Sequence, residues 1–476
     1  MRDELALLDA TAQAELVRAG QVTAVELTEA AIERIEALNP ELNAVVTPAY
    51  EQALEAARTV RGGPFAGVPY LLKDLACEMA GVRFTEGSRF LADNVSTFDA
   101  ELVVRLRNAG LIVLGKTNTP EFGMAPACEP ALFGPTRNSW DTTRSTSGSC
   151  GGSAAAVASG MVPFAHGNDL GGSLRYPASA CGLFALKPTR ARNPLGPEYG
   201  DVAAGGAVEH ALTRSVRDSA ALLDAVHGAD LGAPYHAPAP ERSYLDEVSR
   251  PPGALRIALQ TTAFNGAPTD PECAAAARDA AKLCQSLGHR VDEATVPVDR
   301  EALGRATQVL IGANVLASCE DAAALQGRKL GPDLVEAVTW AIIESAGPAT
   351  SADYARAVRT LHATTRAVEA FFQRFDVLLT PTMAMQPARV GELALSNTPG
   401  AAYGQRLARC VGYTSLFNSS GNPAMSVPLG TASDGMPLGV QFAARFGDEA
   451  TLFRLAGQLE RERPWAERRP RVAAVP

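Results

Sequence analysis

The sequence predicts an α/β fold in which helices cover both faces of a β-sheet. An apolar run at residues 111–116 follows an amphipathic stretch at residues 99–109, and the same alternation returns between residues 255 and 291. Alternating strand and helix patterns favour layered α/β packing. The chain has 476 residues, of which 46% are hydrophobic and 20% charged, a composition typical of a globular protein with one large core.

The first predicted elements form a helical N-terminal arm. Thr23 and Glu26 match a capping box, and apolar residues follow them at helical spacing. The pair Asn39–Pro40 predicts the end of this helix, because the residue before a proline avoids helical backbone angles. Residues 42–46 then predict a first strand. Residues 67–74 predict a second strand, whose apolar run ends at Lys73.

The remaining elements follow the same pattern. A helix at residues 99–109 ends at Gly110, and a buried strand at residues 111–116 follows. Asp270 and Pro271 predict the start of another helix, which Gly288 ends. Further strands are predicted at residues 255–260, near Val291, and at residues 376–381 and 438–442. We find no repeat or domain boundary, so the sequence predicts a single domain over residues 1–476.

Charge and composition argue against several classes of function. Lys and Arg number 43 against 52 Asp and Glu, so the sequence predicts no basic face for nucleic acid. No apolar run reaches the roughly 18 residues that cross a bilayer, and the start MRDELALLDA is unlike a signal peptide. We therefore expect a cytoplasmic protein without a membrane partner. The eight cysteines and six histidines show no metal-ligand spacing, so we expect no metal and no other cofactor.

Two Gly/Ser clusters, at residues 148–153 and 171–173, are the main functional signal. Their serines Ser149 and Ser173 lie 24 residues apart, separated by an apolar, alanine-rich segment that predicts a helix. A flexible linker is the alternative, but a linker would be polar on both sides. The phosphate-loop and Gly-x-Ser-x-Gly patterns do not fit. Glycine-rich loops expose N–H groups that receive negative charge, so a serine there is suited to attack a carbonyl.

Lys73 has two interpretations. As a surface residue it would form an ion pair with Asp74. At the end of a buried strand its ammonium form would be disfavoured, and a neutral amine is a competent general base. The residue pattern alone leaves both interpretations open.

Several motifs resemble a known family. They are GVPYLLKD, LGKTNTPEF, FGPTRNSWD, SGSCGGSAAAVASG, HGNDLGGSLRYPASACGLFALKPT and PLGVQ. Through them nearly the whole chain resembles the amidase signature family of serine hydrolases. The resemblance implies a central mixed β-sheet covered by helices on both faces. It also implies a helical arm at about 1–60, a signature core at about 61–220 and a variable, substrate-facing helical part at about 300–370.

The same resemblance implies roles for individual residues. Ser173 would be the nucleophile, Ser149 a bridging serine after a cis peptide, and Lys73 the base. The backbone N–H groups of Leu170, Gly171, Gly172 and Ser173 would form the oxyanion hole, with Asp169 and Arg175 holding the loop. The sequence departs from the family pattern at Ser139, Ser147, Cys150 and Asn168, where proline, glycine, serine and threonine are usual. His166 is expected to be a packed residue rather than a catalyst.

The resemblance also implies a substrate class. Within the family the chain looks most like amidases of aryl amides, nylon oligomers and urethanes, so a small amide or carbamate is the expected substrate. Candidate pocket walls are Phe133, Tyr199, Trp340 and Tyr413. The alternatives are a glutaminase subunit of a tRNA-dependent amidotransferase and a non-catalytic binding protein on the same fold. A homodimer is also left open.

Overall fold

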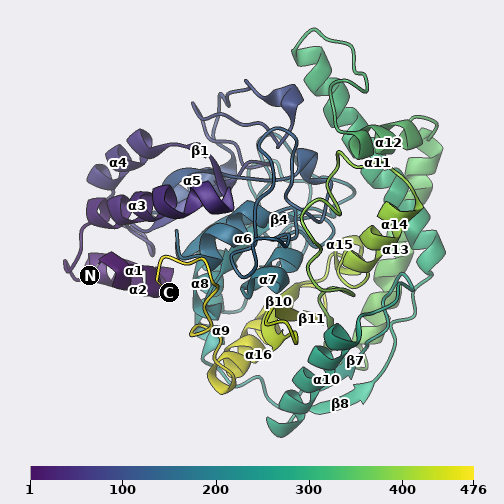
Figure 1. The fold of residues 1–476 in the computed structure, drawn as a ribbon. Helices are drawn as coiled ribbons and strands as arrows, with labels where there is room; N and C mark the ends of the chain where they lie inside the picture. Colours follow the sequence, from purple (N-terminus) through teal and green to yellow (C-terminus); the bar gives the residue numbers. More distant parts are fainter. Residues whose placement is uncertain (1, 476) are drawn as a thin grey trace.

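An 11-stranded mixed β-sheet runs through the molecule (Figure 1). The computed structural model describes residues 2–475. Strands β3, β2 and β4 run parallel, as do β9, β7 and β8, and the other neighbours pair antiparallel. The sheet order is β1 (Val45–Pro48), β3 (Ile112–Thr117), β2 (Pro69–Lys73), β4 (Phe164–Asp169), β6 (Val208–Thr213), β5 (Phe184–Lys187), β10 (Ala424–Thr431), β11 (Pro437–Ala444), β9 (Val377–Pro381), β7 (Arg256–Leu259) and β8 (Arg290–Glu293).

Alternate residues of β2 face opposite layers of helices, as the two-residue period of a strand requires. Leu71 packs in one cluster with α3, α4, α6 and α7, whereas Tyr70 and Leu72 pack in another with α2, α5 and α8. These helices are α2 (Ala10–Arg18), α3 (Ala24–Leu42), α4 (Tyr50–Thr59), α5 (Glu101–Asn108), α6 (Gly151–Ala158), α7 (Arg175–Cys181) and α8 (Val216–Val226). The predicted helix-covered mixed sheet is therefore confirmed at this end.

The other half of the sheet is layered in the same way. In β9, Val377 and Leu379 pack against α10 and α16, whereas Leu378 packs against α13 and α15. The remaining elements are α1 (Arg2–Leu7), α9 (Tyr244–Val248), α10 (Pro271–Ser286), α11 (Arg300–Leu325), α12 (Ala337–Ala346), α13 (Ser351–Phe372), α14 (Ala401–Cys410), α15 (Ser415–Ser420), α16 (Glu449–Glu462) and the 3₁₀ turns η1 (Arg89–Leu91) and η2 (Glu121–Gly123).

The end of α3 differs from the prediction. The capping box is present, with the Glu26 amide donating to Thr23 Oγ1 at 3.1 Å, but the helix continues past Pro40 to Leu42. Asn43 ends it with a left-handed φ of 50°. Asn39 Oδ1 accepts the N–H groups of the two residues after Asn43, so local hydrogen bonds support the exit beyond the proline. The first strand consequently starts at Val45 and not at residue 42.

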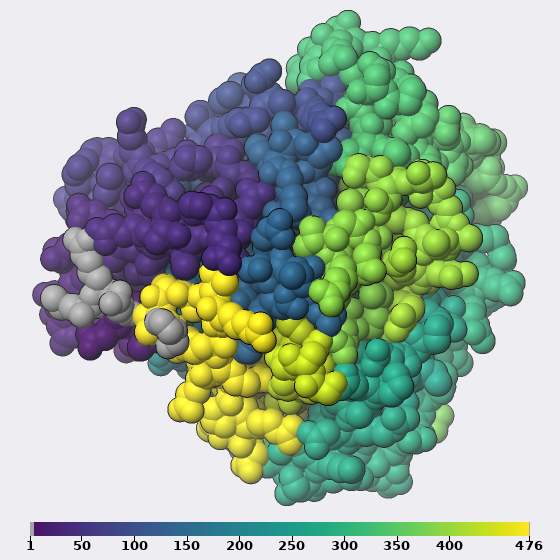
Figure 2. All heavy atoms as spheres, viewed as in Figure 1, coloured from purple at the N-terminus to yellow at the C-terminus, as the bar shows by residue number. Residues whose placement is uncertain are grey.

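The C-terminal segment lies next to the N-terminal part of the chain. Its residues, in yellow, border the purple N-terminal residues (Figure 2). The amide of Ala474 donates to Ser159 O at 2.8 Å, and Trp465 is buried with its Nε1 donating to Arg214 O. Within residues 2–475, no helix is long and apolar enough to cross a membrane.

Candidate active site

Lys73 ends β2 inside the protein, with none of its surface exposed. Its Nζ lies 2.5 Å from Ser149 Oγ and 2.6 Å from Asn168 Oδ1. Asp74 points elsewhere, because its carboxylate accepts the hydroxyl of Thr85 at 2.6 Å and the Thr85 amide. The interpretation of Lys73 as a surface residue paired with Asp74 is therefore wrong, and Lys73 is a buried residue at the end of its strand.

Ser149 lies just before α6 in a tightly packed turn. The Gly148–Ser149 peptide is cis, and Ser147 has a left-handed φ of 59° although it is not glycine. Gly148 has no room for a side chain, since a Cβ there would lie 2.6 Å from Ala127 N. The turn thus holds the serine hydroxyl against the amine of Lys73.

Ser173 lies in the loop of residues 170–173, between β4 and α7. The Cys150 amide donates to Ser173 O at 3.3 Å, which ties this loop to the turn carrying Ser149. Gly172 has a φ of 141°, and a Cβ there would lie 2.2 Å from the Tyr176 ring. Gly171 O accepts the hydroxyls of Tyr176 and Thr414. In the described part of the chain, the N–H groups of Gly171, Gly172 and Ser173 have no protein acceptor.

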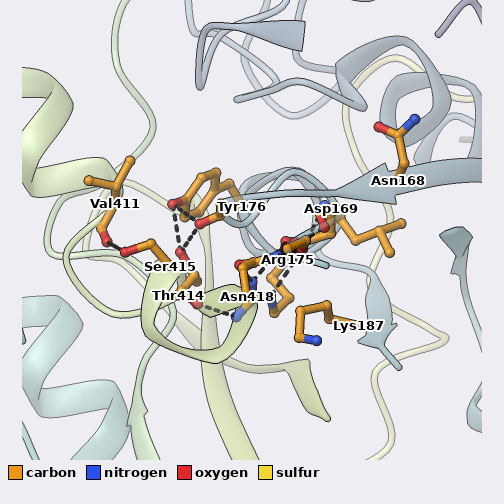
Figure 3. A network of polar contacts seen from close by, with 12 residues as sticks. Asn168, Asp169, Arg175, Tyr176, Lys187, Val411, Thr414, Ser415 and Asn418 are labelled. Carbon is orange, nitrogen blue, oxygen red and sulfur yellow. Dashed lines mark hydrogen bonds and ion pairs between the residues drawn. The ribbon is translucent and has the colours of Figure 1, made fainter. Parts of the chain in front are cut away.

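A buried ion pair lies beneath this loop (Figure 3). Arg175 Nε and Nη2 donate to the two carboxylate oxygens of Asp169, at 2.9 and 2.8 Å. Arg175 also donates to Gln441 Oε1, Thr414 O and Asn418 Oδ1. Burial alone would raise the pKa of Asp169, but the Arg175 charge and hydrogen bonds lower it below its ordinary value. A charged pair therefore fixes both ends of the loop.

His166 braces the strands and does not reach the serines. Its Nδ1 accepts the Lys73 amide at 3.2 Å, and its Nε2 lies 2.6 Å from Glu209 Oε2. Because Nδ1 accepts, Nε2 carries the proton and donates to Glu209. The imidazole thus connects β2, β4 and β6, in agreement with its expected packing role.

A cavity of about 470 Å³ opens at Ser173. Its wall is mostly apolar and comes from η2, the loop of residues 170–173, α11, α12, α14 and α15, with the side chains of Met124, Leu303, Ile311, Ile342 and Leu416. Arg300, at the start of α11, is the one charged residue in the described lining. The cavity is therefore suited to an uncharged, largely apolar group near the serine.

The structure places none of the four predicted aromatic residues on this wall. Phe133 lies under the Arg83 guanidinium, 5.2 Å from ring centre to Cζ. Tyr199 lies in the loop after β5, beside Glu86 and Glu198. Trp340 belongs to α12 and packs against a cluster that includes residues of α11. Tyr413 is fully buried, and its hydroxyl donates to Thr261 O at 2.6 Å.

The sequence predicts a substrate-facing part at about 300–370, which contains α11, but it indicates none of the individual lining residues of α11, α14 or α15. The apolar residues of these helices give no local sign that they face a cavity, because the helices are distant from Ser173 in sequence and come close to it only when the chain folds. The contact of Asn168 with Lys73 was also missed, although its departure from the family pattern pointed to this position. Within residues 2–475, no group of three or more His, Cys, Asp or Glu side chains is placed to hold a metal ion.

The fold and the site define a hydrolase class. A mixed sheet presents a buried lysine bonded to one serine, with a second serine in a loop of unpaired N–H groups at the mouth of a cavity. A model of the amidase family, described as "Amidase", matches residues 26–453. The chain therefore belongs to the amidase family, and it is a hydrolase that acts on carbon–nitrogen bonds.

Individual relatives support this assignment along the whole chain. The 6-aminohexanoate-cyclic-dimer hydrolase of Paenarthrobacter ureafaciens is 42% identical over 484 aligned residues, covering 98% of this chain and 96% of that protein. A solved structure of a 6-aminohexanoate cyclic dimer hydrolase superposes with a TM-score of 0.92 at 41% identity, covering 98% and 99% of the two chains. A bacterial aryl acylamidase superposes with a TM-score of 0.89 at 27% identity, covering 97% of each chain.

The amidotransferase alternative has a more distant counterpart. One component of the glutamyl-tRNA(Gln) amidotransferase of Thermotoga maritima superposes with a TM-score of 0.73 at 28% identity, covering 93% of this chain and 92% of that one. Both in TM-score and in identity, the chain is more similar to the 6-aminohexanoate cyclic dimer hydrolase than to this component.

Proposed function

We propose that this amidase cleaves small or synthetic amides and carbamates through a Ser173 acyl-enzyme, with Ser149 and Lys73 as its proton relay. The 2.5 Å contact between Lys73 Nζ and Ser149 Oγ is the observation that supports the proposal most directly. In its neutral form the amine of Lys73 has a lone pair that can accept a proton. The serine between the lysine and Ser173 both accepts and donates a proton.

In the acylation step, Ser173 Oγ attacks the substrate carbonyl and its proton passes to Ser149. Ser149 at the same time gives its own proton to Lys73. The tetrahedral intermediate then collapses, and the leaving nitrogen takes a proton from Ser149, which recovers one from Lys73. Water repeats the sequence on the ester bond and releases the acid. With a carbamate, the released carbamic or carbonic acid half-ester loses carbon dioxide.

The loop of residues 170–173 would stabilise the oxyanion. N–H groups without a protein acceptor are suited to a substrate oxygen, and losing one such donor typically costs about 3–4 kcal/mol of transition-state stabilisation. Gly171 O accepts hydrogen bonds from the hydroxyls of Tyr176 and Thr414. This bonding supports a rigid hole, because the peptide planes of the loop cannot rotate without losing it.

The cavity and the relatives support the substrate class. Its wall is mostly apolar, and at about 470 Å³ it accommodates an aryl or linear aliphatic group. The relatives include a hydrolase of a 6-aminohexanoate cyclic dimer and an aryl acylamidase. Urethanes share the planar carbonyl–nitrogen group of these amides, so we extend the proposal to aryl carbamates.

One assay tests the proposal. A p-nitroanilide, an aryl carbamate, a 6-aminohexanoate oligomer and glutamine are compared with the wild type and with Ser173→Ala. We expect turnover of at least one of the first three and none by the variant. Turnover of glutamine alone would favour the amidotransferase class, and full activity of a folded Ser173→Ala would exclude the acyl-enzyme on this serine.

A further inference from the structure

Three side chains surround the amine of Lys73. Besides Ser149 Oγ at 2.5 Å and Asn168 Oδ1 at 2.6 Å, Cys150 Sγ lies 3.2 Å from Nζ. A neutral amine has two N–H donors and one lone pair, and an ammonium has three donors. Three partners therefore match the amine in either protonation state, provided that the partner facing the lone pair of the neutral amine can donate a hydrogen bond.

The orientation of Asn168 is fixed by its second contact. Asn168 Nδ2 donates to Leu75 O at 3.2 Å, so the carbonyl oxygen of the amide must face Lys73. An amide oxygen accepts hydrogen bonds and cannot donate one. The side chain points away from the Asp169–Arg175 pair (Figure 3), so it serves the lysine and not that network. Asn168 therefore takes one N–H of Lys73 in both protonation states.

Cys150 is fixed in a similar way. Its Sγ lies 3.1 Å from Asn168 O, to which the thiol hydrogen donates, so its lone pairs are left for Lys73. Burial raises the pKa of this thiol, although the Lys73 charge and hydrogen bond oppose the rise, and the sulfur stays protonated. With Asn168 and Cys150 both accepting, the lone pair of the neutral amine can point only at Ser149.

We propose that Asn168 and Cys150 are positioning residues that aim the Lys73 lone pair at Ser149. The proposal rests on the proposed function, because it gives these residues a role in the relay. It goes beyond that function by assigning two residues at which this chain departs from the usual family pattern. The two accept hydrogen bonds from the amine throughout the cycle, so Lys73 can pick up and return a proton without moving.

Other titratable groups near the lysine are engaged with partners of their own. Asp74 is bonded to Thr85, and Lys116 donates to Cys77 O. The remaining groups that face this region are His166 with Glu209, Asp169 with Arg175, and the protonated Cys128, whose pKa burial raises to about 12. In the described chain none of these side chains contacts Nζ, whereas a substitution at Asn168 changes a direct contact of the amine.

The pH dependence of kcat/KM for Asn168→Asp tests the proposal. The variant keeps the shape but places a carboxylate on the amine, which favours the ammonium form. We expect the acidic limb of the profile to move up by about one to three pH units, since an opposite charge at this distance shifts titration by that amount. We expect KM to stay near the wild-type value. A limb at the wild-type pH in a folded Asn168→Asp protein would overturn the role of Asn168.

Cysteine variants test the second positioning residue. Cys150→Ser keeps a donor and an acceptor and should retain kcat within about threefold, whereas Cys150→Ala removes the acceptor and should lower kcat at least tenfold, a loss of about 1.4 kcal/mol. Cys284→Ser, a buried cysteine of α10, is the matched control and should leave kcat unchanged. Equal activity of the Ser and Ala variants would exclude the role of Cys150.

The failure of this inference is distinguishable from failure of the proposed function. If Lys73→Ala and Ser173→Ala are inactive while Asn168→Asp has the wild-type profile, the relay stands and the positioning role is wrong. If Asn168→Asp loses rate equally at every pH, Asn168 is only structural, which also overturns the proposal. If Lys73→Ala keeps the wild-type rate, the proposed relay itself is wrong.

Discussion

Arg175 binds both carboxylate oxygens of Asp169, at 2.9 and 2.8 Å, and neither side chain is exposed. The two residues lie on either side of the loop that carries Ser173. Removing one partner of a buried ion pair leaves an uncompensated charge in a low-dielectric interior. The position of the loop and the stability of the fold therefore depend on the same pair.

Asp169→Asn tests this dependence. The amide is similar in shape but leaves the Arg175 charge unpaired, so we expect the free energy of unfolding to fall by about 3–5 kcal/mol. Chemical denaturation measures this loss. Glu55→Gln, which breaks the exposed pair of Glu55 with Arg58, is the control and should have a much smaller effect. Equal losses in the two variants would show that the buried pair adds no special stability.

The fold could be predicted where local patterns and burial agree. Helices α3, α5 and α10 and strands β2, β3, β7 and β9 all lie where apolar periodicity and capping residues indicate them. Strand β4 was not predicted, because its buried sequence FAHGND is half polar. Its polar side chains are satisfied by partners distant in sequence, such as Glu209 for His166 and Leu75 O for Asn168. Such partners are visible only in the folded chain.

The site was predicted in part, for the same reason. Lys73 and Ser149 were expected together only through the family resemblance, and they lie 2.5 Å apart. The cavity wall depends on where α11 and α15 meet the sheet, which no local pattern specifies. The predicted aromatic residues have other partners, as with Tyr413 and Thr261.

The stability of the α12 start should depend on pH through Glu336. Burial raises the pKa of Glu336 from an ordinary 4.5 to about 7. The hydrogen bond from the Ala131 amide opposes this rise, and the charge of Glu121 adds to it. One of the Glu336 oxygens, Oε2, is buried without a partner. A raised carboxyl pKa gives stability that is full below pH 4.5 and is lost as the pH rises through 7. Glu336→Gln has no carboxyl group at this position, so it does not lose this stability as the pH rises.

We therefore expect the stability of Glu336→Gln relative to the wild type to increase between pH 5 and pH 8. Urea unfolding at a series of pH values measures the difference between the two proteins. Comparison with the wild type removes the contribution of other buried carboxyls, such as Glu460, whose pKa burial raises to about 7. A difference that is constant over this range would show that Glu336 titrates alike in the folded and unfolded chains.

The width of the cavity should be set by α11. Ile311 lines the cavity, so Ile311→Trp reduces the room for the substrate. We expect kcat/KM for a p-nitroanilide with a long acyl chain to fall at least tenfold, and that for the acetyl analogue to change little. Leu325→Trp, at the exposed end of the same helix, is the control. If both substrates lose activity equally, Ile311 supports the fold and does not limit the substrate.

The charge preference of the enzyme should depend on Arg300. Arg300 is exposed and is the one charged residue in the described lining of the cavity. Its guanidinium packs close against Gly266, because a Cβ added to that glycine would lie 2.5 Å from Arg300 Nη1. The guanidinium thus lies along the cavity edge, where it attracts anions. A charge pair at about 4 Å in water is worth about 1 kcal/mol, or roughly a fivefold effect.

We expect p-nitroanilides ending in a carboxylate to react faster than matched p-nitroanilides ending in an ammonium. Arg300→Gln should abolish this preference, and Arg300→Glu should reverse it. Arg305→Glu, further along α11 and outside the lining, is the control and should leave the ratio of kcat/KM values unchanged. If Arg300→Glu has the wild-type ratio, substrates do not reach this edge of the cavity.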